Sequence, residues 1–119
     1  YLAGVKKMDA HEPLRGALLE GYVAQNLLAI LAAHQPDARM TYWNVQGRFE
    51  VDFIIEFGRE TVAVEVKHGS RIQESDMAGI KAYMAGSKNC KAGIVAYNGT
   101  QVVKVGEKIW GVPVSLLLS

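Results

Sequence analysis

The sequence predicts an α/β fold, a single domain over residues 1–119 in which helices flank a mixed central sheet. Three observations predict it. The segment 13–34 is long and almost uncharged, as a buried helix is. The segments 49–57 and 61–67 alternate like strands, and a helical pattern over 73–85 leads to an apolar strand over 91–97. With a strand beginning near residue 40, the predicted order is α-β-β-β-α-β-(β).

The first helix is expected to begin at Pro13 and to stop before Gln35-Pro36-Asp37. Its predicted buried stripe comprises Leu14, Leu18, Gly21, Ala24, Leu28 and Leu31, widened by Val23, Leu27 and Ile30. Between residues 16 and 33 the only formal charge is Glu20. A carboxylate on such a helix needs a polar partner within the protein. The alternative is an edge residue that reaches solvent.

The two alternating segments are expected to form a β-hairpin across Gly58-Arg59, because glycine at the first central position suits a type II′ turn. If Phe57 pairs with Glu60, Asp52 faces Glu65, with Cβ atoms roughly 4.5–5.5 Å apart. The same register places Glu50 opposite Lys67. The polar face also carries Ile54 and Ala63, so it is expected to be covered at one end.

The helix over 73–85 is expected to be capped by Ser70 and to bury Ile72, Met77, Ile80, Tyr83 and Met84. The crossover through this helix is long enough for the strands 61–67 and 91–97 to pair in parallel. Asn98-Gly99 then predicts a type I′ hairpin turn into a strand over 101–105. Pro113 predicts that the last element, over 109–114, lies at an edge of the sheet.

Composition narrows the function classes. The chain has 119 residues, is 50% hydrophobic and 21% charged, and carries a net charge of +1, which is well short of a dedicated duplex-binding domain. With no signal peptide, no apolar run of membrane-spanning length and a single cysteine, Cys90, we expect a cytoplasmic protein without a membrane partner. Several basic residues are expected around the acids, where they would contact phosphates or simply form solvated surface: Arg48, Lys67, His68, Arg71 and Lys81.

The facing acids predict a cation site. Two adjacent, partly shielded carboxylates either share a proton or bind a cation. Magnesium prefers a few carboxylate oxygens and keeps several waters, which fits Asp52 and Glu65 with the carbonyl of Val66. Lys67 would then orient the attacking water or neutralise transition-state charge. The alternative is a solvated face with an ordinary Glu50–Lys67 cross-strand pair.

The order of these residues resembles the PD-(D/E)xK nuclease superfamily, and its spacing is similar to that of archaeal Holliday-junction resolvases. A closer resemblance is to the C-terminal domain of unknown function of predicted bacterial and archaeal AAA-type ATPases. It is carried by GALLEGYVA at 16–24, TYWN at 41–44, FEVDFI at 49–54 and VEVKHG at 64–69, and covers about residues 1–100. Val51 stands where the motif has proline.

The resemblance implies a restriction-endonuclease-like αβββαβ core. It implies that Glu20, Asp52, Glu65 and Lys67 are catalytic and that Asp52, Glu65 and Glu20 hold Mg²⁺ or Mn²⁺. Gln73 and Arg71 are the expected substrate-binding residues. The expected partner is DNA, branched or otherwise structured. The resemblance does not decide whether the chain forms a homodimer.

The resemblance also implies an upstream ATPase. The chain begins at Tyr1 without an initiator methionine, so we expect it to be the C-terminal fragment of a longer protein. It has no Gly-x-x-x-x-Gly-Lys-Ser/Thr loop, and this piece should not hydrolyse ATP by itself. The competing hypothesis is a catalytically inactive nuclease fold that binds nucleic acid or a protein and regulates the ATPase.

Overall fold

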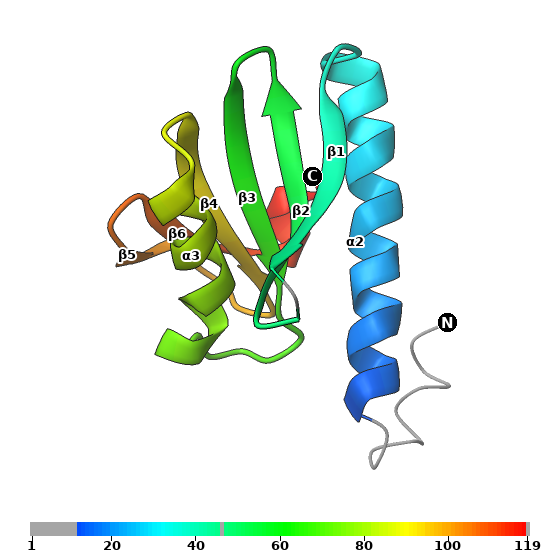
Figure 1. The fold of residues 1–119 in the computed structure, drawn as a ribbon. Helices are drawn as coiled ribbons and strands as arrows, with labels where there is room; N and C mark the ends of the chain where they lie inside the picture. The colour runs from blue at the N-terminus through cyan, green and yellow to red at the C-terminus, as the bar shows by residue number, and fades with distance from the viewer. Residues whose placement is uncertain (1–11, 46, 119) are drawn as a thin grey trace.

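The computed structural model describes residues 12–45 and 47–118, the first of them, 12–17, only in their backbone (Figure 1). The elements in chain order are α2 (Glu12–His34), β1 (Arg39–Val45), β2 (Phe49–Phe57), β3 (Glu60–Val66), the 3₁₀ turn η1 (Glu74–Met77), α3 (Ala78–Gly86), β4 (Cys90–Tyr97), β5 (Val103–Gly106), β6 (Ile109–Pro113) and α4 (Val114–Leu117).

The strands form one six-stranded mixed sheet in the order β1-β2-β3-β4-β6-β5. The first three strands are an antiparallel meander, as expected. Strand β3 then pairs in parallel with β4 through the crossover that contains η1 and α3, and β4 pairs in parallel with β6. The predicted α/β fold with a mixed sheet flanked by helices is therefore confirmed.

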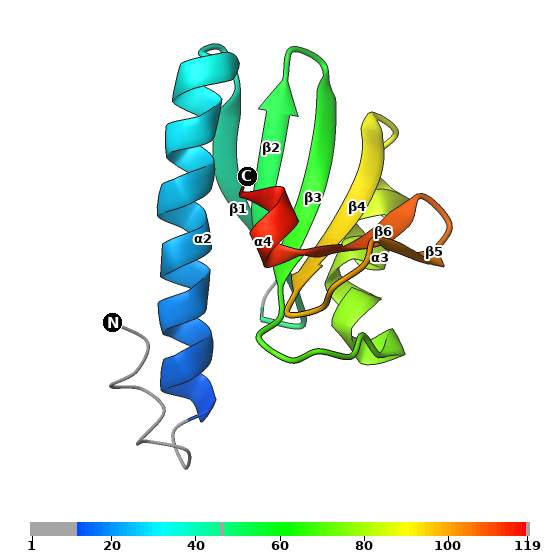
Figure 2. The ribbon, with the colours of Figure 1, turned by 180° about the vertical axis from the view of Figure 1, so that it is seen from behind.

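Helices cover both faces of this sheet (Figures 1 and 2). On one face, Val23 and Leu27 of α2 pack against Phe53, Ile55 and Val64, and α4 packs beside them. On the other face, residues of η1, α3 and the sheet form a second core, which contains Val51, Ile54, Ala63, Met77, Ile80 and Val95. The expected cover over the polar face of the hairpin at Ile54 and Ala63 is confirmed, because both residues are buried in the core that η1 and α3 form with the sheet, whereas Glu50 on the same strand is exposed.

The hairpin of β2 and β3 has the predicted register, from Phe57 opposite Glu60 to Phe53 opposite Val64. Gly58 has φ +62°, the left-handed conformation that its place in a two-residue turn requires. This turn is determined locally by two residues, so sequence reasoning recovers it.

The buried side of α2 agrees with the predicted stripe in part, since Ala24 and Leu31 pack against the core that contains Val23 and Leu27. Val23 and Leu27 are buried, whereas Leu28 is 52% exposed. Leu14 belongs to the part of α2 whose side chains the structure does not describe. Because α2 is apolar around most of its circumference, hydrophobicity did not specify the limits of the side that meets the sheet.

The predicted helix between β3 and β4 is confirmed as α3, with a correction at its start. It begins as the 3₁₀ turn η1 with Gln73, not Ser70, at its N-cap. Its predicted apolar side chains, Ile72, Met77, Ile80, Tyr83 and Met84, do contribute to the second core.

The C-terminal strands correct two expectations. Asn98-Gly99 does not form a hairpin turn, because β5 pairs with β6 and not with β4. Strand β6 is also not an edge strand. Pro113 is tolerated there because it is the last residue of β6, opposite Tyr97. Cys90 is buried, as expected of a small apolar residue, and none of the described helices is both long and apolar enough to cross a membrane.

Candidate metal and catalytic site

A β-bulge in β2 sets the direction of Asp52. Thr41 of β1 lies opposite Ile54 and Trp43 lies opposite Val51, so Asp52 and Phe53 together face the single residue between them. Val51 and Ile54, three positions apart, consequently lie in the same core cluster on the α3 side. Strict alternation would also place Asp52 on that side. The extra residue of the bulge turns the Asp52 side chain toward the opposite side of the sheet, where it contacts Glu20 of α2.

The ladder between β2 and β3 opens directly beside Asp52. The last residue pair of this ladder is Phe53 with Val64. Beyond it, backbone N–H groups donate to two side-chain carboxylates and not to backbone carbonyls. The Asp52 N–H donates to Glu65 Oε1 at 3.0 Å, and the Val66 N–H donates to Asp52 Oδ2 at 2.8 Å. The expected proximity of Asp52 and Glu65 is confirmed, although side chains hold them together in place of a regular strand pair.

Glu20 completes a cluster of three carboxyl groups. It comes from α2, and a hydrogen bond joins its side chain to Asp52. We call Glu20, Asp52 and Glu65 the acid cluster. It draws on α2 and on the neighbouring strands β2 and β3, as the motif predicts. Glu20 is itself an exposed residue, so the cluster is open to solvent on the α2 side.

Burial and mutual contact shift the titration of all three groups. Glu20 is exposed overall but its carboxyl group is partly shielded, and this partial desolvation, followed by the hydrogen bond with Asp52, raises its pKa to about 7. Burial and the hydrogen bond with Glu65 raise the pKa of Asp52 to about 7, against the opposing effect of the Val66 amide. Burial also raises the pKa of Glu65. A raised pKa favours the protonated form of each group, which lessens the repulsion between the carboxylates.

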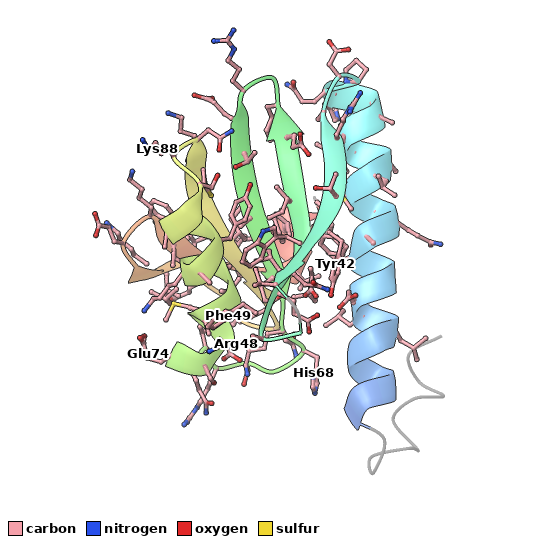
Figure 3. The ribbon with its side chains drawn as sticks, in the orientation of Figure 1. Tyr42, Arg48, Phe49, His68, Glu74 and Lys88 are labelled. Atoms are coloured by element: carbon pink, nitrogen blue, oxygen red, sulfur yellow. The ribbon has the colours of Figure 1, made fainter. Side chains whose placement is uncertain are left out.

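Glu50 lies at the border of this cluster. Its charge contributes to the raised pKa values of Glu20 and Glu65. The hydroxyl of Tyr42, on β1, donates to Glu50 Oε2 at 2.6 Å, and Asn44 Nδ2 donates to that hydroxyl at 3.2 Å. Tyr42 lies on the side of β1 that is next to α2 (Figure 3). Sequence reasoning assigned Glu50 to Lys67 and did not consider Tyr42.

Lys67 is not hydrogen-bonded to the acid cluster. Its ammonium lies 3.1 Å from Asp76 Oδ1 and 3.0 Å from Asp76 Oδ2, an ion pair between η1 and the residue that follows β3. The expected Glu50–Lys67 pair is therefore replaced by Glu50 with Tyr42 and Lys67 with Asp76. Asp76 did not appear among the expected residues, although an acid three positions after Gln73 is a helix-start signal.

The two expected substrate-binding residues lie on the loop before η1 and at its start. Arg71 and Gln73 are both exposed. The Gln73 N–H donates to Asp76 Oδ2 at 2.7 Å, so Gln73 forms the N-terminal turn of η1. Of the expected phosphate contacts, Arg48 and His68 lie at the same end of the molecule (Figure 3). Lys81 instead pairs with Glu74 at 2.8 Å on the solvent side.

The donor chemistry of the acid cluster fits magnesium or manganese, since these ions take carboxylate oxygens. Asp52 and Glu65 each use one oxygen for a backbone amide, and their carboxyl groups also contact one another and Glu20. As the side chains stand, however, no group of three His, Cys, Asp or Glu residues within 12–45 and 47–118 is arranged to hold an ion. Binding would require the cluster to lose its protons.

Comparison with known proteins places this site within a recognised domain. The comparison with curated proteins gives no match. A family model described as "Domain of unknown function (DUF4143)" matches residues 15–117, which include the acid cluster, Lys67 and Asp76. Since the match extends over most of the 119 residues, the chain belongs to the DUF4143 family.

Proposed function

We propose that this chain is a metal-dependent endonuclease domain that cleaves DNA phosphodiester bonds. The observation that carries the proposal is the convergence of Glu20, Asp52 and Glu65, from a helix and two strands, into one cluster with raised pKa values. Strongly perturbed carboxyl groups gather at functional sites more often than in ordinary surface pairs. A β-bulge and an opened strand ladder build this cluster, so it is not a by-product of regular pairing.

The fold is consistent with the proposed chemistry. Its elements follow the order α2, β1–β3, α3 and β4, the sequence of a restriction-endonuclease-like αβββαβ core, with β5, β6 and α4 added after it. Membership of the nuclease superfamily is part of the proposal, since fold order alone does not establish an activity.

Each residue has a distinct role in the proposal. Asp52 and Glu65 hold the cation directly, and Glu20 holds it through water or binds a second ion. A bound Mg²⁺ or Mn²⁺ supplies Lewis acidity toward the phosphate and acidifies a water molecule. Lys67, two residues after Glu65 on β3, orients the water or neutralises developing charge. Arg71 and Gln73 contact the DNA backbone from the loop before η1.

The partners follow from the family. Domains of this family are often found at the C-terminus of AAA-type ATPases, and we propose that an upstream ATPase directs this domain to its DNA substrate. Branched or otherwise structured DNA is the proposed substrate, from the resemblance to Holliday-junction resolvases.

A second function is supported by the position of Lys67. Its ammonium is paired with Asp76, and burial and mutual contact raise the pKa values of the acids. This arrangement also suits a nuclease fold that has lost catalysis and binds nucleic acid or a protein to regulate the ATPase. The two functions differ in metal dependence: the regulatory module should bind its partner equally well in a chelator.

The test combines calorimetric titration of Mn²⁺ with cleavage of linear and branched DNA. We expect Mn²⁺ binding in the wild-type chain and its loss in Asp52→Asn. Lys67→Ala should retain Mn²⁺ binding but abolish cleavage, because the lysine acts after the cation is bound. Glu56→Gln is the matched control, an acid on the same strand that contacts Thr41 rather than the cluster. Cleavage that survives in Asp52→Asn or resists a chelator would refute the proposal.

A further inference from the structure

The acid cluster leaves one part of the expected motif unexplained: what determines the position of Lys67. Its side chain is 25% exposed, and that of Asp76 is 20% exposed. Both groups are thus largely withdrawn from water. A long lysine side chain loses substantial rotamer entropy when it is fixed, so a specific partner is needed to keep it in one place.

Asp76 is built to be that partner. Both of its oxygens lie within 3.1 Å of Lys67 Nζ. Its Oδ2 also accepts the Gln73 N–H at 2.7 Å, and its own N–H donates to the Gln73 carbonyl at 3.0 Å. The carboxylate is therefore fixed by the first turn of η1 before it meets the lysine. A preorganised carboxylate gives a stronger ion pair than a mobile one.

A neighbouring ion pair provides the contrast. Glu74, on the same 3₁₀ turn, pairs with Lys81 at 2.8 Å, but the two side chains are 78% and 48% exposed. Figure 3 shows Glu74 at the periphery of η1. An exposed pair of this kind is expected to contribute little. The two ion pairs differ in burial and in the backbone hydrogen bond to Asp76, and only one of them involves a residue of the proposed site.

The geometry assigns Asp76 as the positioning residue for Lys67, holding its ammonium at the end of β3 and linking it to the turn that carries Gln73. The catalytic part of this inference rests on the proposed function. Asp76 itself contacts neither the acid cluster nor the reacting atoms in this assignment. Its effect passes through Lys67: loss of the charge at position 76 frees the ammonium, and movement of η1 moves the lysine.

Asp76→Asn is the informative substitution, because an asparagine oxygen still accepts the Gln73 N–H while the negative charge is lost. Glu74→Gln is the matched control, with the same change of charge on the same turn. Asp76→Glu restores the charge on a longer side chain. All three variants are compared with the wild-type chain by thermal unfolding, to establish that each is folded.

The first readout does not depend on cleavage. Trace labelling with an amine-reactive acetylating reagent, followed by mass spectrometry, reports how freely each lysine reacts. We expect labelling of Lys67 to rise about threefold to tenfold in Asp76→Asn, the effect of losing one charge-assisted hydrogen-bonded pair. Glu74→Gln should leave Lys67 unchanged, and Asp76→Glu should restore most of its protection. Equal labelling of Lys67 in the wild-type chain and Asp76→Asn overturns the assignment.

The second readout is Mn²⁺-dependent DNA cleavage. Asp76→Asn should lower kcat about tenfold or more with an unchanged KM for DNA and unchanged Mn²⁺ affinity, because only the lysine is displaced. A variant with unchanged kcat and freely labelled Lys67 would overturn the catalytic part. A wild-type chain that binds Mn²⁺ but does not cleave would refute the proposed function, and the labelling result would still decide the role of Asp76.

Discussion

Replacing Asp52 with asparagine should stabilise the metal-free domain at alkaline pH and leave it unchanged at acidic pH. In the folded protein the pKa of Asp52 is raised from 3.8 to about 7, so this group stays protonated over a range in which the unfolded chain has already lost the proton. The folded state binds more protons between about pH 4 and 7, and its stability falls as pH rises through that window. Asparagine has no charge to bury, and it can still accept from Val66 and donate to Glu65.

The size of the effect follows from the same shift. About three pKa units correspond to at most about 4 kcal/mol, and solvent on the Glu20 side of the cluster reduces this to about 2 kcal/mol. For a domain of this size, that is an increase in Tm of about 8 °C at pH 8. At pH 5 the wild-type Asp52 is already protonated, and the two proteins should unfold within about 2 °C of each other.

The assay is thermal unfolding followed by circular dichroism in EDTA at pH 5 and pH 8, with Glu56→Gln as the control for loss of an acid from β2. Excess Mn²⁺ at pH 8 should raise the Tm of the wild-type chain and leave that of Asp52→Asn unchanged. The reasoning is refuted if Asp52→Asn lowers the Tm equally at both pH values. That result would mean that the Asp52 carboxylate is needed as a structural acceptor and that its burial as a charge is not costly.

Two further predictions concern packing and the border of the acid cluster. Gly79→Ala should lower the free energy of unfolding in urea by about 1–3 kcal/mol, because a Cβ there would overlap the Glu50 carbonyl where α3 crosses β2. The control is Gly86→Ala, in open space at the end of the same helix, which should leave the free energy of unfolding unchanged. Equal effects at both sites would contradict this packing. The hydrogen bond to Glu50 raises the pKa of Tyr42, so Glu50→Gln should lower the alkaline midpoint of one tyrosine in an absorbance titration, and an unchanged titration would exclude that hydrogen bond.

The parts of the fold that sequence reasoning recovered are those determined by short-range patterns. The Gly58-Arg59 turn, the alternation of β2 and β3 and the length of the α3 crossover each depend on neighbouring residues, and the structure confirms the resulting register and strand directions. The buried side of α2 was recovered at Val23, Ala24, Leu27 and Leu31 but not at Leu28, because a helix apolar on most sides does not fix the limits of its contact with the sheet.

In the candidate site, too, the features set by short-range patterns were predicted and those set by tertiary packing were not. The proximity of Asp52 and Glu65 follows from the hairpin register, and motif resemblance adds Glu20. The bulge at Asp52 leaves no sequence signal, since its neighbours Val51 and Phe53 are equally suited to either face of a two-sided sheet. The pairing of Lys67 with Asp76 depends on how η1 packs. In the sequence, the position of Asp76 indicates only the start of a helix.

The open ladder between β2 and β3 has a consequence for folding kinetics. The hairpin can form early from local contacts, but the acid cluster exists only once α2, much earlier in the chain, has docked across it. Interactions completed after the rate-limiting step change the unfolding rate rather than the folding rate. A cation held by Glu20, Asp52 and Glu65 should therefore lower the unfolding rate of the domain and leave its folding rate nearly unchanged.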